Sequence, residues 1–365
     1  MRIAFYAPLK SPNHPIPSGD RQMARMLMAA LIRAGHAVGI ASELRAFSAS
    51  SAIGAHDEVR RVAQQEVARI AANWARETPP DLWFCYHPYY KAPDFIGPEL
   101  AHRFGIPYVT VEASWSSRRS VDAWAESQKV VADGVRQAAL NICVRAKDRD
   151  GLKKIAPHGR YEMLDPFIDV EPFKAVEARL NSRRIVTVAM MRSGDKLDSY
   201  RFLARALERV EHLPWTLAVV GDGPAHDDVR AEFARLDPAR VEWLGEKAPL
   251  EIPALLAEGA IYAWPGFGEA YGVAYLEAQA AGLPVVALAT DGVPAVVRDG
   301  RTGLLTPSGN VAAYADALAR LLEDATLRRS MSEAARGFVM FERSFGIASA
   351  RLAEILSLIP RRADA

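Results

Sequence analysis

Two consecutive series of short apolar runs, each alternating with helical patterns, constrain the fold of this chain more than any other feature. The first series begins with residues 3–7, continues with a helical pattern from Asp20 that stops at Gly35, and then has an apolar run at 37–41. A strand, a helix and a strand of these lengths predict a βαβ crossover, which requires a parallel sheet. The later strand-like runs of this series are 82–86, 108–111 and 140–144.

The second series follows a break rich in proline and acidic residues that begins near residue 165. Two βα series of similar size predict two doubly wound Rossmann-like α/β domains with parallel sheets, and a ligand cleft at the carboxyl ends of the strands. We expect domains at 1–165 and 183–340, a linker at 166–182, and a C-terminal helix within 341–365 that packs back towards the first domain. The strand-like runs of the second series are 185–189, 216–220, 241–244, 261–264 and 284–288.

Charge and cysteine content exclude several classes of function. The formal net charge of the 365 residues is +1, so no global field attracts nucleic acid, and phosphate recognition has to be local. Cys85 and Cys143 each lie in an apolar run, at a spacing that fits neither a zinc site nor a disulfide framework. No apolar stretch is long enough to span a membrane, and the N-terminal run is too short for a signal peptide. We expect a cytoplasmic protein, with peripheral contact at the inner face of the membrane left open.

The segment between Pro265 and Gly282 carries the most chemical information. A buried strand ends near Pro265, and a helix begins near Gly272. The first amides of a helix have no internal partners, and the helix dipole adds positive potential there, so this end can seat a phosphate. Glu269 lies before the helix and Glu277 in its second turn. Carboxylates on either side of a diphosphate can accept hydrogen bonds from sugar and ribose hydroxyls.

An ordinary structural explanation exists for each of these residues taken alone. A glutamate on a helix usually lies on a solvated surface, and two glycines before a helix usually form only a turn. The joint occurrence of both acids and Gly272 directly after a buried strand favours a ligand site.

This segment resembles the retaining glycosyltransferases of family 4, which have the two-domain GT-B fold. Their signature has two glutamates separated by seven residues, and this chain has EAYGVAYLEAQAAGLPVV at 269–286. The segments VVGDGP at 219–224 and GVPAVVRDGRTGLL at 292–305 resemble further family motifs. Ala270 and Ala295 stand where the family usually has Gly and Glu, and neither difference removes a required charge from the donor site.

The resemblance implies a nucleotide-sugar donor site in the second domain. In it, Glu277 binds the ribose hydroxyls, and Glu269 binds the hydroxyls of the transferred sugar. Backbone amides of Tyr271, Gly272 and Val273 face the phosphates. The remaining donor-binding residues that the resemblance implies are Gly223 in the glycine turn and Leu244, Gly245 and Glu246 beside the nucleobase.

A leaving nucleoside diphosphate needs positive charge, because negative charge develops on it as the glycosidic bond breaks. Relatives supply an Arg and a Lys after the first strand of this domain, and Arg192 and Lys196 stand in that loop. Arg192 is one position closer to the lysine than is usual, and Leu197 replaces a customary glycine. Two solvated loop charges are the alternative. No Asp-x-Asp metal motif is evident in the donor-site segments, so we expect no metal and no cofactor beyond the donor substrate.

The resemblance assigns the first domain to acceptor binding. Gly19 opens its first helix, where it would approach the donor phosphates or the transferred sugar. Glu112 replaces a histidine that lies near the reacting sugar in relatives, and we expect it, with His87 and with Glu269 of the second domain, to serve catalysis. Trp115 and the arginines that follow it are weaker acceptor-binding candidates.

The function implied is retaining transfer of a hexose-like residue from a nucleoside diphosphate sugar to a hydroxyl of a surface polysaccharide, a glycolipid or a small glycoside. Two alternatives stay open. The chain could be a catalytically silent sugar-nucleotide-binding subunit of a transferase complex, as the replacement by Glu112 suggests. It could also be another GT-B enzyme, such as a sugar-nucleotide epimerase or a glycan phosphorylase. The sequence indicates neither the donor base nor the oligomeric state.

Overall fold

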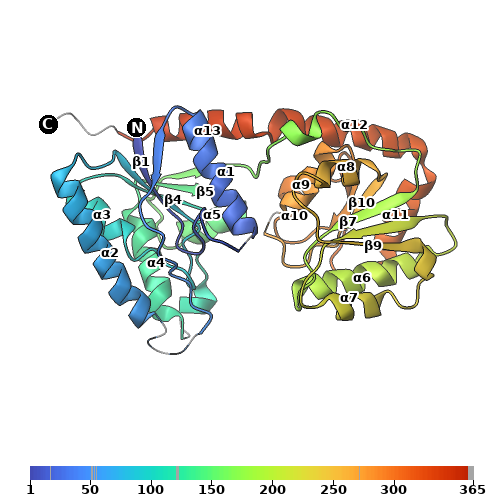
Figure 1. Ribbon diagram of the computed structural model, residues 1–365, viewed down its shortest axis with the longest axis horizontal. Coiled ribbons are helices and arrows are strands. Elements are labelled where there is room, and N and C mark those ends of the chain that lie inside the picture. The colour runs from blue at the N-terminus through green and yellow to red at the C-terminus, as the bar shows by residue number, and fades with distance from the viewer. Residues whose placement is uncertain are drawn as a thin grey trace. The chain divides into compact units, whose positions relative to one another are not determined.

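The computed structural model describes residues 1–16, 18–50, 52, 54, 56–120, 123–270 and 272–360, without the side chain of Ser120 (Figure 1). The chain forms two compact units. The first comprises residues 1–165 and the segment from Gly346, and the second comprises Pro166–Phe345. Each unit is a parallel sheet with helices packed on it, and we treat each by itself.

The sheet of the first unit has the strand order β2-β1-β3-β4-β5-β6, and every pairing in it is parallel. Its strands are β1 (Arg2–Tyr6), β2 (Ala37–Ile40), β3 (Leu82–Tyr86), β4 (Tyr108–Val111), β5 (Leu140–Cys143) and β6 (Tyr161–Met163). Its helices are α1 (Gly19–Arg33), α2 (Asp57–Arg76), α3 (Gly97–Phe104), α4 (Ala125–Gln137), α5 (Ala146–Lys153) and α13 (Phe345–Ser357), with a 3₁₀ turn η1 (Ser117–Ser120).

Helix α1 forms where the apolar spacing predicts it. Ser18 caps it by accepting a hydrogen bond from the Arg21 amide, and Leu27 and Leu31 are buried against the sheet. Gly35, with a φ of 85°, lets the chain turn back into β2. Helix α13 packs on this unit, because the Ser349 hydroxyl donates to the carbonyl of Ala30 in α1.

One buried acid organises the core of the first unit. The Asp94 carboxylate accepts hydrogen bonds from the Trp83 indole (3.0 Å), the Tyr108 hydroxyl (3.2 Å) and the backbone amides of Ile96 and Gly97. Four donors satisfy a group that would be costly to bury alone. Asp94 therefore has a structural role.

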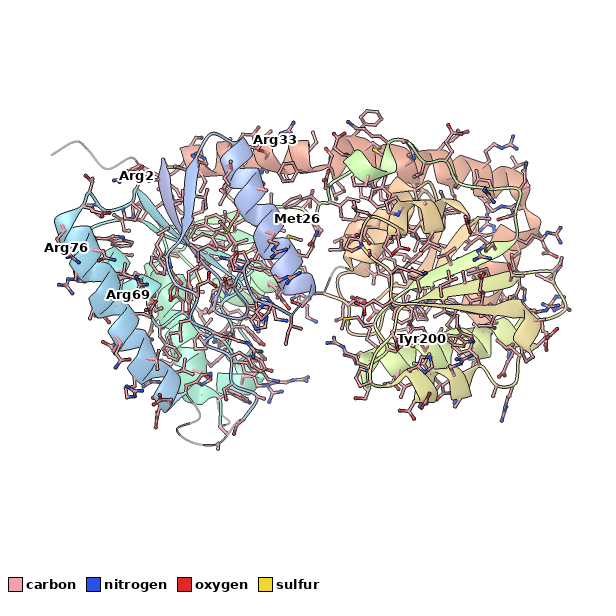
Figure 2. The ribbon with its side chains drawn as sticks, in the orientation of Figure 1. Arg2, Met26, Arg33, Arg69, Arg76 and Tyr200 are labelled. Carbon is pink, nitrogen blue, oxygen red and sulfur yellow. The ribbon has the colours of Figure 1, made fainter. Side chains whose placement is uncertain are left out.

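The sheet of the second unit has the strand order β12-β11-β10-β7-β8-β9, again with parallel pairing throughout. Side chains fill the layer between this sheet and its helices, including Tyr200 of α6 (Figure 2). The strands are β7 (Arg184–Val188), β8 (Thr216–Val220), β9 (Val241–Gly245), β10 (Ile261–Ala263), β11 (Val285–Leu288) and β12 (Gly303–Thr306). The helices are α6 (Asp195–Arg209), α7 (His226–Glu232), α8 (Ile252–Ala257), α9 (Val273–Ala280), α10 (Val293–Val296), α11 (Val311–Glu323) and α12 (Ala325–Glu342), with 3₁₀ turns η2 (Glu171–Phe173) and η3 (Pro238–Arg240).

The segment 166–182, which the sequence predicts as a linker, packs within the second unit. Phe167 and Phe173 are buried. The Arg336 guanidinium of α12 donates to the carbonyls of Phe173, Lys174 and Val176 in this segment. The acidic residues and prolines of this segment indicate a linker, but its aromatic side chains and its backbone carbonyls anchor it to the second unit.

The expected α/β architecture is present, and several strands, such as β3, β4 and β8, have the expected bounds. Two strands were not predicted. Strand β6 has only three residues, all half-buried at the sheet edge, so it lacks a strong apolar signal. Strand β12 begins at Gly303, inside a sequence that looks like a turn.

Candidate functional site

The second unit has a topological switch point beside its first strand. Strand β7 pairs with β8 on one side and with β10 on the other. The connections that follow β7 and β10 therefore diverge at the carboxyl edge of the sheet, which is where open α/β sheets bind ligands. Helix α6 follows β7, and the loop 264–272 leads from β10 into α9.

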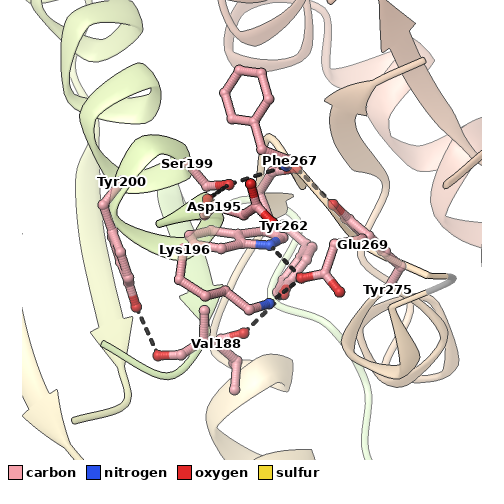
Figure 3. A network of polar contacts seen from close by, with 11 residues as sticks. Val188, Asp195, Lys196, Ser199, Tyr200, Tyr262, Phe267, Glu269 and Tyr275 are labelled. Atoms are coloured by element: carbon pink, nitrogen blue, oxygen red, sulfur yellow. Dashed lines mark hydrogen bonds and ion pairs between the residues drawn. The ribbon is translucent and has the colours of Figure 1, made fainter. Parts of the chain in front are cut away.

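Three side chains meet at this switch point. Lys196, in the first turn of α6, forms an ion pair with Glu269 from the loop after β10, and the two point towards one another in Figure 3. Trp264 donates its indole N–H to Oε1 of Glu269 (3.1 Å), and Lys196 Nζ lies 5.3 Å from the centroid of the Trp264 ring. The side chains of Lys196 and Glu269 are only 18% and 16% exposed. The structure thus brings together the predicted cation and the predicted sugar-binding acid.

The loop that carries Glu269 is held tightly against α6. The Ser199 hydroxyl accepts a hydrogen bond from the Phe267 amide (3.1 Å). Gly268 has a φ of 65°, and a Cβ there would meet the Asp195 carboxylate at 2.2 Å. A larger residue at 268 would push the loop off α6, so this glycine fixes the position of Glu269.

Glu277 lies in the second turn of α9 and is half-buried. Among the described residues, no donor makes a hydrogen bond or an ion pair with its carboxylate. Burial raises the pKa of Glu277 to about 7. The charges of both Glu269 and Glu277 raise the pKa of the buried Tyr262 hydroxyl, after burial itself as the main cause, so both acids lie within electrostatic reach of this one group.

The N-terminus of α9 opens without a side-chain cap. Gly272 is the N-cap residue in a left-handed conformation (φ 62°), and Val273 is the first helical residue. Such an end leaves amides available to an anion. Tyr271, predicted to contribute a phosphate-binding amide, lies outside the residues that the structure describes.

The other predicted donor residues of the glycine turn and the nucleobase edge lie on the neighbouring loops. A Cβ at Gly223 would meet the carbonyl oxygen of Met191 at 2.2 Å, so the loops after β8 and β7 touch through their backbones. Gly245, at the end of β9, accepts the Gly221 amide (2.9 Å). Leu244 is half-buried, and Glu246 is exposed.

Arg192 is the one predicted cation that the structure does not bring into this cluster. Its side chain is exposed, and among the described residues it has no ion-pair or hydrogen-bond partner. Only its carbonyl is used, as the acceptor for the Leu197 amide.

The first unit has its own switch point, between β1 and β3. His87 directly follows β3, and its Nδ1 lies 3.0 Å from Oδ1 of Asp20 in the first turn of α1. Glu112 directly follows the adjacent strand β4 and is 4% exposed. His87 and Glu112 have positive φ angles of 59° and 57°. Non-glycine residues adopt this conformation at a cost, and it recurs at functional sites.

The charges of this cluster influence one another. Burial opposes the charged form of His87, but Glu112 and Asp20 outweigh it and raise the pKa of the imidazole. Burial raises the pKa of Glu112, while His87 and Arg145, just after β5, limit the rise. Burial also disfavours charge on Asp20, yet the hydrogen bond from His87 keeps the pKa of Asp20 below its ordinary value. The pKa of each of these groups therefore depends on its charged neighbours as well as on burial.

Gly19 is the first residue of α1, adjacent to Asp20, and no heavy atom lies within 4 Å of where its Cβ would be. The acceptor-binding candidates in and before η1 lie beside other aromatic residues. Trp115 packs against a small core cluster, and the Arg119 guanidinium lies 5.3 Å from the Tyr90 ring centroid.

Sequence reasoning missed Trp264, Asp20 and Arg145. The sequence pattern predicts Trp264 only as the end of a strand. It predicts Asp20 only as the start of a helix, although an acid in the first turn after a switch-point strand is a usable signal. Arg145 follows β5 as Glu112 follows β4, and that parallel would have identified it.

No group of three or more His, Cys, Asp or Glu residues that could hold a metal ion occurs in the described part of the chain. In the same part, none of the helices combines the length and apolar character needed to cross a membrane.

Comparison with solved structures defines the class first. Sucrose-phosphate synthase from Thermosynechococcus elongatus aligns with a TM-score of 0.76 at 16% identity, over 98% of each chain. Anabaena HepE in complex with UDP aligns with a TM-score of 0.74 at 17% identity, over 98% of this chain and 100% of that one. The chain therefore has the GT-B fold.

The family model for glycosyl transferases group 1 matches residues 182–324. D-inositol 3-phosphate glycosyltransferase of Mycolicibacterium paratuberculosis is 33% identical over 70% of this chain and 63% of its own length. The same enzyme of Corynebacterium aurimucosum is 45% identical over 26% of this chain and 23% of its own length. The chain is thus a relative of the family 4 glycosyltransferases, although it spans less than a third of the first curated relatives that it matches.

Proposed function

We propose that this protein is a glycosyltransferase that moves a hexose-like residue from a nucleoside diphosphate sugar to an acceptor hydroxyl. One observation carries the proposal. At the switch point of the second unit, a lysine and a glutamate are paired beside an uncapped helix N-terminus, and the same helix carries a desolvated glutamate without a partner.

The donor would engage these groups from one end to the other. Glu277 would accept hydrogen bonds from the two ribose hydroxyls. These bonds would supply donors to a partly desolvated carboxylate that has none among the described residues. The amides at Gly272 and Val273 would face the diphosphate, together with the Lys196 ammonium. Glu269 would accept hydroxyls of the sugar. Donor binding would thus exchange the Lys196–Glu269 ion pair for one contact to phosphate and one to sugar.

In the reaction, the bond between the anomeric carbon and the phosphate oxygen would break, and the acceptor oxygen would bond to that carbon. The acceptor proton would pass to the leaving phosphate oxygen. Lys196 and the N-terminus of α9 would stabilise the charge on the diphosphate, so the proposal includes no metal. Retention of anomeric configuration follows from the family resemblance, in which acceptor and leaving group share one face of the sugar.

We propose that Glu112, His87 and Asp20 of the first unit act on the acceptor and on the reacting sugar. A desolvated carboxylate can stabilise an oxocarbenium-like centre, and a histidine held by an aspartate can orient a hydroxyl. Relatives are named for D-inositol 3-phosphate and for a GDP-mannose-dependent transfer to phosphatidylinositol monomannoside, and HepE was solved with UDP-glucose. These names support nucleotide-sugar donors and acceptors that are polyols, glycans or glycolipids. The proposal places the reaction in the cytoplasm or at the inner face of the membrane.

A thermal-shift screen over UDP-, GDP- and ADP-sugars tests donor binding. At a ligand concentration of about 100 Kd, binding adds about 2.7 kcal/mol to the free energy of unfolding. We expect one nucleotide series to raise Tm clearly above the others. A flat response to all three series would contradict the proposal.

Product analysis with that donor separates the alternatives. A transferase forms a new glycoside only when an acceptor is present, and NMR of the anomeric proton reports whether configuration is retained. An epimerase changes the donor without an acceptor, and a phosphorylase needs inorganic phosphate. A silent subunit binds the donor without releasing nucleoside diphosphate.

A further inference from the structure

A cavity of about 570 Å³ lies at the amino edge of the second sheet. It is bounded by the starts of β7 and β8, by the residue before β9 and by the end of α8. Four arginines and one acid, Glu258, line it, along with uncharged residues. The arginines are Arg179, Arg183, Arg184 and Arg240.

Two of the guanidinium groups are held in place by other contacts. Arg184 forms an ion pair with Glu242 (2.5 Å) and a longer one with the cavity's own acid, Glu258 (4.0 Å), yet its Nε is buried and has no hydrogen-bond partner. Arg240 donates to the carbonyl of Leu213 (2.8 Å), and its guanidinium lies 5.0 Å from the centroid of the Trp215 ring. A guanidinium has five N–H donors, so these contacts leave donors of both groups unused. Fixed donors reduce the entropy cost of binding a ligand.

The other two arginines are exposed and carry uncompensated charge. Among the described residues, no carboxylate forms an ion pair with Arg179 or Arg183. The charge of Arg183 also acts on a residue outside the cavity lining, Arg328. Burial lowers the pKa of the neighbouring Arg328 guanidinium, and the charge of Arg183 lowers it further. An excess of positive charge in a concave site attracts and concentrates anions.

The donor site does not account for this cavity. Arg184 begins β7, whereas Lys196 and the donor loops follow the opposite end of the same strand. A strand of five residues separates its ends by roughly 13 Å, at about 3.3 Å per residue. Ligands of open α/β sheets bind at the carboxyl edge, so an arginine-lined cavity at the amino edge needs a separate explanation.

We propose that this cavity is a binding site for a phosphate-bearing anion, distinct from the donor site. Planar guanidinium groups match the oxygens of phosphate in bidentate geometry, and the volume is within the range of small-molecule sites. Arg184 and Arg240 would hold the phosphate, while Arg179 and Arg183 would close over it from the rim. The site stands independently of the function proposed above. A free phosphorylated metabolite and the headgroup of an anionic phospholipid share this chemistry.

The first test uses inorganic phosphate as the probe. The apparent Kd is obtained from the dependence of Tm on phosphate concentration at constant ionic strength. It is measured in a Lys196→Ala background so that the donor loops contribute little. The double variant Arg179→Ala/Arg183→Ala should bind phosphate about ten-fold more weakly or worse. Arg301→Ala/Arg320→Ala, which removes two exposed arginines outside the cavity, should bind as the parent does.

The second test asks whether a lipid supplies the phosphate. Co-sedimentation is measured with vesicles of phosphatidylcholine alone and with added phosphatidylglycerol. Binding to the anionic vesicles that is lost only in the cavity variant supports the site and assigns it to a headgroup. Phosphate binding without vesicle binding supports the site and assigns it to a free metabolite. Equal effects in both double variants, or no binding of either probe by the parent, would overturn the proposal.

Discussion

Each unit pairs a carboxylate with a basic side chain at the same topological position. The element that carries the carboxylate in one unit carries the basic residue in the other. In the second unit the base, Lys196, lies in the helix after the first strand, and the acid, Glu269, lies after the strand across the switch. In the first unit the acid, Asp20, lies in the helix, and the base, His87, lies after the strand across the switch. Doubly wound sheets direct loops to this edge, and the residue types decide what each edge can bind.

The two pairs differ in the charge that they offer to a ligand and in their ability to exchange protons. The second pair combines a lysine with an uncapped helix N-terminus, which suits a diphosphate. The first pair combines a histidine, whose pKa is raised by Glu112 and Asp20 against the effect of burial, with the neighbouring carboxylates, which suits the orientation of a hydroxyl and the handling of its proton. We therefore propose donor binding for the second unit and acceptor chemistry for the first, and the following predictions test that division.

The largest effect is expected from Lys196→Ala. The substitution removes the cation that would neutralise the leaving diphosphate, and among the described residues it leaves the Glu269 carboxylate with only the hydrogen bond from Trp264. We expect kcat/KM to fall by about 10²–10³-fold, a loss typical of removing one group that stabilises developing charge. Lys174→Ala, at an exposed lysine paired with Glu171, is the matched control. Turnover near the wild-type value in Lys196→Ala would show that Lys196 does not stabilise the leaving diphosphate.

The next largest effect is expected from Glu277→Gln, which should weaken donor binding by about 10–100-fold, because two charge-assisted hydrogen bonds to ribose become weaker. In the wild-type protein, protonation of Glu277 below its pKa of about 7 should weaken donor binding as pH falls from 8 to 5. Calorimetric titrations across this range check both statements. Affinity that is independent of pH in the wild type would show that Glu277 does not contact the donor.

The same substitution should stabilise the protein without donor. The pKa of Glu277 is higher in the folded state (about 7) than in the unfolded chain (4.5). The folded state therefore binds more protons, and stability falls as pH rises between these two values. Glutamine avoids this loss, so Glu277→Gln should gain roughly 1–3 kcal/mol at pH 8 and little at pH 4.5. Urea unfolding at both pH values measures the gain, and an equal effect at both would refute this account of Glu277.

A smaller effect is expected in the first unit from Asp20→Asn. The asparagine cannot favour charge on His87 as the carboxylate does, so the pKa of His87 should fall. We expect turnover to decrease by about ten-fold, in line with loss of assistance to proton transfer, while donor affinity stays unchanged. NMR titration of the His87 ring, assigned with His87→Gln, reports the pKa. Asp57→Asn, at the start of α2, is the control. A His87 titration unaltered by Asp20→Asn would exclude the coupling.

The smallest effect is expected from Gly19→Ala. Because no heavy atom would lie within 4 Å of the new Cβ, Tm should be unchanged or slightly higher. A loss of turnover of about two- to five-fold would then report a close approach of substrate. In Gly223→Ala the Cβ would meet the Met191 carbonyl, and we expect a loss of about 1–3 kcal/mol in stability. Equal destabilisation by both substitutions would mean that Gly19 has a packing role.

The sequence predicted the architecture well, because strands buried on both faces leave strong apolar runs and helices leave a 3.6-residue period. It failed where those signals are weak, as at the short edge strand β6. It also failed where polar residues mask buried aromatics, as in the segment around Phe173, whose backbone is anchored by Arg336, 163 residues away.

The sequence also identified separate acids and cations but not their pairing. Glu269 and Lys196 are identified from two separate sequence segments. Their contact depends on strand β10 lying beside strand β7. The hydrogen bond from Trp264 to Glu269 and the separation of Arg192 from the cluster also depend on how neighbouring elements pack. Side-chain direction at a loop depends on the packing of neighbouring elements, as with Gly268 against Asp195, and no local pattern encodes it.

The division between the two units is tested most directly by measuring donor affinity in Lys196→Ala and His87→Gln side by side. The donor found in the thermal-shift screen is titrated calorimetrically into both variants and the wild type. We predict that Lys196→Ala weakens donor binding by about 10-fold or more, whereas His87→Gln binds the donor as the wild type does. Equal loss in both variants, or loss only in His87→Gln, would contradict the assignment of donor binding to the second unit.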